Sequence, residues 1–152
     1  MKLQVLGIGK IRETYFKEAV EEYSRRIGHY VPFRVRDAAK EISGNAQDLE
    51  EAYGRLRKEH QKADLKVALD SRGSIMSSED FAVWFEKAML ESVGLVSFII
   101  GGPHGLAGSA LEESDQKLSL GAMTLPHQLA RLVLLEQIYR AFTIIRGEPY
   151  HK

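Results

Sequence analysis

His127 and Arg131 are the pair of residues in this sequence whose types and spacing most directly suggest chemistry. They stand four residues apart at the start of a predicted helix, so their side chains share one face of it. Arginine holds anions, and histidine takes up or releases a proton near neutral pH. The pair could therefore bind an anion or move a proton, and a structural role at the end of the helix is the alternative interpretation.

The C-terminal segment 146–152 carries a second group of such side chains, directly after the same helix. It contains two cations, the aromatic ring of Tyr150 and the imidazole of His151. Side chains of this kind contact RNA phosphates and stack on bases. Most terminal segments have no specific partner, so the composition alone does not assign a role.

Several other chemistries lack the residues that they need. The chain has no cysteine, which excludes disulfides, thiolate catalysis and the usual structural zinc sites. Its five histidines lack metal-ligand spacing, so we expect no metal site, and neither a Walker-type lysine motif nor a G-x-S-x-G motif occurs. Gly7-Ile8-Gly9 begins like a dinucleotide-binding loop, but Arg12 replaces the third glycine, which favours a plain turn.

Predicted strands and helices alternate along the chain. This order is typical of an α/β fold with a parallel-rich sheet and helices on both faces. With 152 residues and 44% hydrophobic content, the chain fits one domain covering 1–152. The predicted strands are 3–8, 33–37, 65–70, 95–100 and about 117–122. The predicted helices are about 12–30, one through 49–56, one through 81–89, a short one after 105, and 126 to about 145.

Three loops should meet at the carboxyl ends of the strands, where open α/β sheets bind ligands. They are 69–73, 101–105 and 120–125, and each contains glycine or another small residue that lets a ligand approach the backbone. The loops offer backbone amides and apolar walls with few charges. This environment favours an adenine-bearing cofactor over a polyphosphate.

The last predicted helix has apolar residues around its whole circumference, which is a poor fit to the surface of a monomer. A second subunit is the natural cover in so small a protein, and it predicts a symmetric homodimer. A helix wrapped by its own domain is the alternative. The chain has no apolar run of membrane-spanning length and no secretion-signal pattern, so we expect a cytoplasmic protein without a membrane partner.

Three stretches of the sequence resemble a known family. They are Met123–Arg131 (MTLPHQLAR), Glu136–Phe142 (EQIYRAF) and Pro149–Lys152 (PYHK). These motifs are similar to the signature of the bacterial ribosomal large-subunit RNA methyltransferases that modify N3 of a pseudouridine, which are minimal members of the SPOUT superfamily. The resemblance covers essentially the whole chain.

The resemblance implies a deep trefoil knot near the C-terminus, S-adenosylmethionine as cofactor, and 23S ribosomal RNA in the assembled ribosome as substrate. The zero net charge fits a substrate that offers more than naked RNA. The cofactor-binding positions that it implies are Leu69, Gly101, Leu120, Gly121, Ala122, Met123, Thr124 and Leu125.

We assign further roles on the same basis. His127 would accept the N3 proton or orient the reacting group. Arg131 and Arg140 would hold RNA phosphate, and Tyr150 and His151 would position the nucleobase. Two other functions stay open: a non-catalytic knotted ribosome-binding assembly factor, and a SPOUT methyltransferase that acts on transfer RNA.

Overall fold

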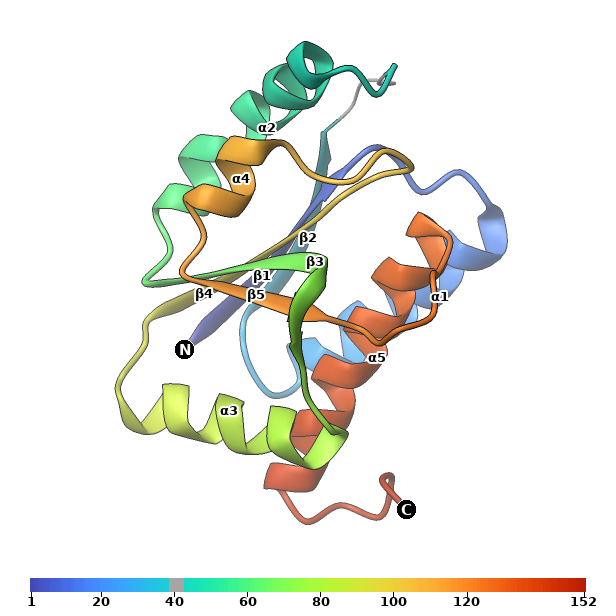
Figure 1. Cartoon of the computed structure of the whole chain (residues 1–152). Helices are drawn as coiled ribbons and strands as arrows, with labels where there is room; N and C mark the ends of the chain where they lie inside the picture. Colours follow the sequence, from blue (N-terminus) through green and yellow to red (C-terminus); the bar gives the residue numbers. More distant parts are fainter. Residues whose placement is uncertain (39–42) are drawn as a thin grey trace.

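A computed structural model of the chain describes residues 1–38 and 43–152 (Figure 1). These residues form strands and helices that alternate along the sequence. The strands are β1 (Lys2–Ile8), β2 (Phe33–Ala38), β3 (Leu65–Ile75), β4 (Leu95–Ile100) and β5 (Gln116–Ser119). The helices are α1 (Thr14–Gly28), α2 (Ala46–Gln61), α3 (Ser78–Leu90), α4 (Gly108–Glu112) and α5 (His127–Ile145).

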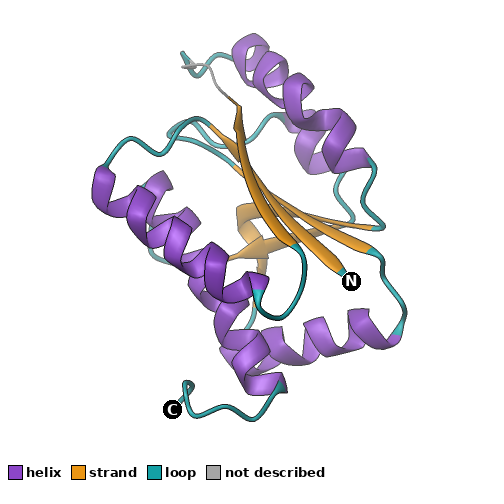
Figure 2. Cartoon of the chain, turned by 180° about the vertical axis from the view of Figure 1, so that it is seen from behind, coloured by secondary structure: helices purple, strands orange, loops and turns teal. Residues whose placement is uncertain are grey.

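The strands form one parallel sheet in the order β2-β1-β4-β3-β5. Alternate side chains of the central strand β4 enter two cores, as expected for a strand that is covered on both faces. Phe98 belongs to the core that contains residues of α1, α3 and α5, and Ile99 belongs to the core that contains residues of α2 and α4. Figures 1 and 2 show these two helical layers on opposite faces of the sheet. The structure thus confirms the α/β prediction and the central position of 95–100.

The predictions that the third strand ends at residue 70 and that 69–73 is a loop were wrong. β3 continues to Ile75, and its register against β5 shifts between Leu69 and Ser74. The glycine that suggested a turn instead makes room for the neighbouring strand, because a Cβ at Gly73 would lie 2.6 Å from the Lys117 backbone.

Three other elements end or begin inside their predicted bounds. β5 ends at Ser119, where the Ser119 Oγ accepts a hydrogen bond from the Gly121 N–H at 3.2 Å and turns the chain out of the sheet. Residues 120–125 are therefore a loop. α1 is shorter at both ends than the predicted helix 12–30, and α5 begins at His127 with Pro126 as its N-cap. Among the residues that the structure describes, no helix is long and apolar enough to cross a membrane.

A buried chain of hydrogen bonds joins α2 to the sheet through His60. The Ser114 Oγ donates to the Ala110 carbonyl at 2.8 Å, so it accepts from the His60 Nε2–H at 3.0 Å. The His60 Nδ1 then accepts from the Ser97 Oγ at 2.9 Å, and that oxygen accepts from the Gln4 Nε2 at 2.9 Å. The neutral imidazole is fully satisfied, and burial lowers the pKa of His60 to about 4.

This arrangement predicts a loss of stability in acid. In the unfolded chain His60 takes up a proton below its ordinary pKa of about 6.5, whereas in the folded chain it stays neutral down to a pKa of about 4. The stabilisation is therefore complete above pH 6.5 and falls as the pH drops toward 4. We expect this histidine alone to lower the free energy of unfolding by about 2 kcal/mol between pH 7.5 and pH 5.

Urea unfolding at both pH values checks this expectation when the wild type is compared with His60→Gln. The variant is less stable throughout, but its stability should depend less on pH over this range. An equal pH dependence in the two proteins would show that His60 does not contribute it.

Candidate active site

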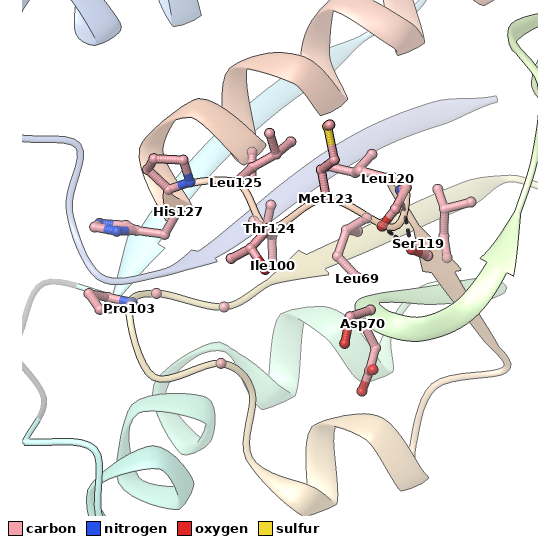
Figure 3. Close-up of a pocket in the computed structure, with 18 of the residues that line it drawn as sticks. Leu69, Asp70, Ile100, Pro103, Ser119, Leu120, Met123, Thr124, Leu125 and His127 are labelled. Carbon is pink, nitrogen blue, oxygen red and sulfur yellow. Dashed lines mark hydrogen bonds between the residues drawn. The ribbon is translucent and has the colours of Figure 1, made fainter.

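A cavity of about 730 Å³ opens where residues 69–71, in the irregular middle of β3, meet the loops 101–105 and 120–126 that follow β4 and β5 (Figure 3). All the residues predicted to bind a cofactor line it, and His127 and Ala130 extend its wall at the start of α5. The structure therefore brings together the three segments that were predicted to meet, although 69–73 belongs to strand β3 and is not the loop that the sequence predicted. Among the described residues that line the cavity, Asp70 is the one carboxylate.

Close backbone packing shapes the loop after β4. A Cβ at Gly101 would lie 2.6 Å from the backbone of Gly105, and a Cβ at Gly102 would lie 2.6 Å from the Ile8 carbonyl oxygen. Gly105 also has a φ of 79°, which side chains disfavour. Glycine at these positions holds the loop against the sheet and leaves space above it for a ligand.

His127 lies at the rim of the cavity, at the first turn of α5 (Figure 3). Burial, and then the positive charges of Arg131 and Arg12, lower the pKa of His127 below its ordinary value. The imidazole is therefore neutral at pH 7 and can accept a proton. The position and the neutral state of His127 fit a general base at the mouth of the cavity.

Arg131 lies inside the protein, although it shares the helix face of His127. Its side chain is fully buried, forms an ion pair with Asp37 at the end of β2, and donates to the Gly9 carbonyl at 3.2 Å. A Cβ at Gly7 would collide with the guanidinium, so glycine makes the space that Arg131 fills. In this chain Arg131 joins the ends of β1 and β2 to the start of α5, and it does not present its charge to the surface.

Sequence reasoning missed Gln128. Its Oε1 accepts hydrogen bonds from the backbone N–H groups of Arg12 at 2.8 Å and Glu13 at 3.2 Å. It thereby fixes the start of α1 beside the start of α5. No local pattern indicates this role, because the partners are more than a hundred residues away in the sequence.

Arg140, Tyr150 and His151 form a second cluster at the other end of α5. The Tyr150 hydroxyl donates to the Glu136 Oε1 at 3.0 Å, and the Arg140 guanidinium lies 4.9 Å from the centre of the Tyr150 ring. The His151 Nε2 lies 2.8 Å from the Glu79 Oε1 at the start of α3. We call Glu79, Glu136, Arg140, Tyr150 and His151 the tail cluster.

The tail cluster and the cavity are well separated within one chain. Along α5, His127 lies nine residues from Glu136, or about 14 Å along the helix axis, and thirteen residues from Arg140, or about 20 Å. Figure 1 shows the C-terminus beyond the far end of α5 from the cavity loops. The five residues predicted to handle the substrate thus fall into two groups: His127 and Arg131 by the cavity, and Arg140, Tyr150 and His151 in the tail cluster.

Comparison with known proteins places this architecture in a family. The family model described as "Predicted SPOUT methyltransferase" matches residues 1–151. The chain is 43% identical to the ribosomal RNA large subunit methyltransferase H of Carboxydothermus hydrogenoformans and 42% identical to that of Acetivibrio thermocellus, with complete coverage of both proteins in each case.

Solved structures share the fold at low sequence identity. A probable methyltransferase from Bordetella pertussis superposes with a TM-score of 0.62 at 13% identity, covering 92% of this chain and 95% of that one. The SpoU methyltransferase AviRb from Streptomyces viridochromogenes, solved in complex with the cofactor AdoMet, gives 0.52 at 15% identity, covering 91% and 57%. The full-length matches in sequence and the shared fold together show that this chain belongs to the SPOUT methyltransferase family, alongside the ribosomal RNA large subunit methyltransferases H.

Proposed function

We propose that the chain transfers the methyl group of S-adenosylmethionine to N3 of a pseudouridine in 23S ribosomal RNA, on the assembled ribosome in the cytoplasm. The observation that carries this proposal is the cavity that the middle of β3 forms with the loops after β4 and β5, in a chain of the SPOUT methyltransferase family. The full-length relatives, named as ribosomal RNA large subunit methyltransferases, support the choice of substrate.

The cavity fits an adenosyl group. Its volume of about 730 Å³ lies in the range of small-molecule sites, and its walls are mainly apolar side chains and glycine backbone. S-adenosylmethionine supplies an electrophilic methyl group. Leu69, Gly101 and the loop 120–125 would hold it, so that the protein's main contribution is to place the two reactants close together and in line.

His127 would remove the N3 proton of the base. Its lowered pKa keeps the imidazole neutral at physiological pH, and it lies at the mouth of the cavity, where a base would enter. The buried Arg131 would act indirectly, by fixing the helix turn that carries His127. Its position inside the protein supports this role over a direct contact with RNA phosphate.

The tail cluster would complete the site of a second subunit. Arg140, Tyr150 and His151 are too far from the cavity of their own chain to touch a base bound there, whereas a symmetric homodimer could bring the tail of one chain to the cavity of the other. Large hydrophobic side chains also lack cover in one chain, because Met123, which lines the cavity, is 86% exposed and Tyr15, at the start of α1, is 64% exposed. The deep trefoil knot, with α5 threaded through a loop, is part of the same proposal and is supported by the family membership.

Incubation of the purified protein with methyl-labelled S-adenosylmethionine and three substrates tests the function. Intact ribosomes that lack the modification should be labelled, and mass spectrometry should place one methyl group on a pseudouridine of 23S RNA. Free ribosomal RNA should be a poor substrate, since a chain of zero net charge has little general affinity for phosphate. Labelling of transfer RNA alone would overturn the choice of substrate, and binding to ribosomes without methyl transfer would indicate an assembly factor.

A further inference from the structure

Glu136 is the centre of the polar contacts in the tail cluster. Its Oε1 accepts hydrogen bonds from the Arg140 Nε at 3.0 Å, from the Arg140 Nη2 and from the Tyr150 hydroxyl at 3.0 Å. Its Oε2 accepts from the Gln137 Nε2 at 2.7 Å. One carboxylate on the rigid helix α5 therefore holds both an arginine and the tyrosine of the irregular tail.

The tail has several other attachments. The Tyr150 hydroxyl lies 3.4 Å from the Tyr23 hydroxyl, and the centre of the Tyr150 ring lies 4.7 Å from that of Tyr139. The tail follows α5 without regular structure, and the Tyr30 hydroxyl donates to Glu148 at 2.6 Å while His151 contacts Glu79 at 2.8 Å. Both of these contacts involve exposed groups. The Glu136 side chain is only 19% exposed, and it supplies a charged acceptor to the Tyr150 hydroxyl.

The carboxylate also determines how Arg140 and Tyr150 can act. Its hydrogen bonds to Arg140 raise the pKa of that guanidinium. Burial, then the hydrogen bond with Tyr23 and then the one with Glu136 raise the pKa of the Tyr150 phenol, so its hydroxyl stays protonated. The guanidinium is then held over the Tyr150 ring and reaches the His151 Nδ1 at 3.1 Å. The side chains thus form one preorganised unit before any substrate binds.

We propose that Glu136 is a positioning residue for the RNA: it fixes Arg140 and Tyr150 in the geometry in which they meet the base that is methylated. This inference rests on the proposed function and adds a residue to which no role in it was assigned. Glu136 itself would touch neither the cofactor nor the base. Loss of Glu136 would lower the rate of methyl transfer, because a misplaced tail no longer aligns the nucleobase with the methyl group. Binding of the ribosome would change less, since the rest of the protein still contacts it.

Glu113 provides a matched control on the opposite face of the sheet. Its carboxylate also accepts hydrogen bonds from an arginine, a tyrosine hydroxyl and a glutamine, namely Arg57, Tyr53 and Gln61. The exposure is similar, at 23% for Glu113 and 19% for Glu136. The two residues therefore make comparable local contacts, and only Glu136 is bonded to the tail.

The test compares Glu136→Ala, Glu136→Gln and Glu113→Ala in steady-state methylation of ribosomes. We expect Glu136→Ala to lower kcat at least about tenfold and to change the KM for ribosomes less than about twofold. Glu136→Gln keeps an acceptor oxygen and should retain more activity. Affinity for S-adenosylmethionine should stay at the wild-type value in all three variants, and Glu113→Ala should keep the wild-type kcat.

An unchanged kcat in Glu136→Ala would overturn the inference while leaving the proposed function intact. A parallel loss of kcat in Glu113→Ala would also overturn it, since the effect would then reflect general destabilisation. Failure of the wild type itself to methylate ribosomes would overturn the proposed function, and this inference with it.

Discussion

Removal of Tyr150, His151 and Lys152 is expected to reduce methyl transfer to ribosomes at least about 100-fold, because a reacting group that loses its alignment costs rate factors of this order. The affinity for S-adenosylmethionine should not change. The deleted residues lie at the far end of α5 from the cavity, and none of them lines it. Single-turnover methylation and calorimetric titration of the cofactor measure the two quantities separately.

Removal of Lys152 alone is the control, since this residue is exposed and follows the contacts that Tyr150 and His151 make. The shorter truncation should retain nearly full activity. The account would be contradicted if the three-residue truncation methylated ribosomes at the wild-type rate, or if it lost the cofactor affinity together with the activity.

Replacement of Thr124 by tryptophan is expected to weaken binding of S-adenosylmethionine by on the order of 100-fold, or about 2.7 kcal/mol. Thr124 lines the cavity and is exposed, so the fold does not depend on its side chain (Figure 3). The larger indole would occupy space that the adenosyl group needs. Calorimetric titration measures the affinity, and thermal unfolding should show a midpoint close to that of the wild type.

Val83→Trp is the matched control, because Val83 is 62% exposed on α3 and does not line the cavity. It should bind the cofactor with wild-type affinity. Wild-type affinity in Thr124→Trp would show that the cofactor does not occupy this cavity.

The layout of the cavity followed from patterns that the sequence displays locally. Apolar strands end in glycine-containing loops at 101–105 and 120–125, and parallel strands bring their carboxyl ends to one edge, so the meeting of these two loops could be predicted. Residues 69–71 also reach the cavity, but from the irregular middle of β3 and not from a loop. The order of the strands was not predicted beyond the central place of 95–100. It depends on pairings between segments that are distant in the sequence.

Glycines were the main source of error because a glycine fits both a turn and a close contact. Gly73 was interpreted as the end of a strand, yet it lets β5 approach β3. Gly7 was interpreted as part of a turn, yet it leaves the space that the Arg131 guanidinium fills. The burial of Arg131 could not be predicted from its own helix. The space for its guanidinium lies beside Gly7 of β1, and its partner Asp37 belongs to β2.

A mixture of two inactive variants tests most directly whether the cavity and the tail cluster belong to one site shared by two chains. Thr124→Trp has an intact tail and a blocked cavity, and the chain truncated after Pro149 has an intact cavity and no tail. Each is expected to be inactive alone. Random exchange of subunits should restore about one quarter of the wild-type activity, because half of the dimers are mixed and each mixed dimer has one complete site. Activity no greater than that of the two variants measured separately would contradict the account.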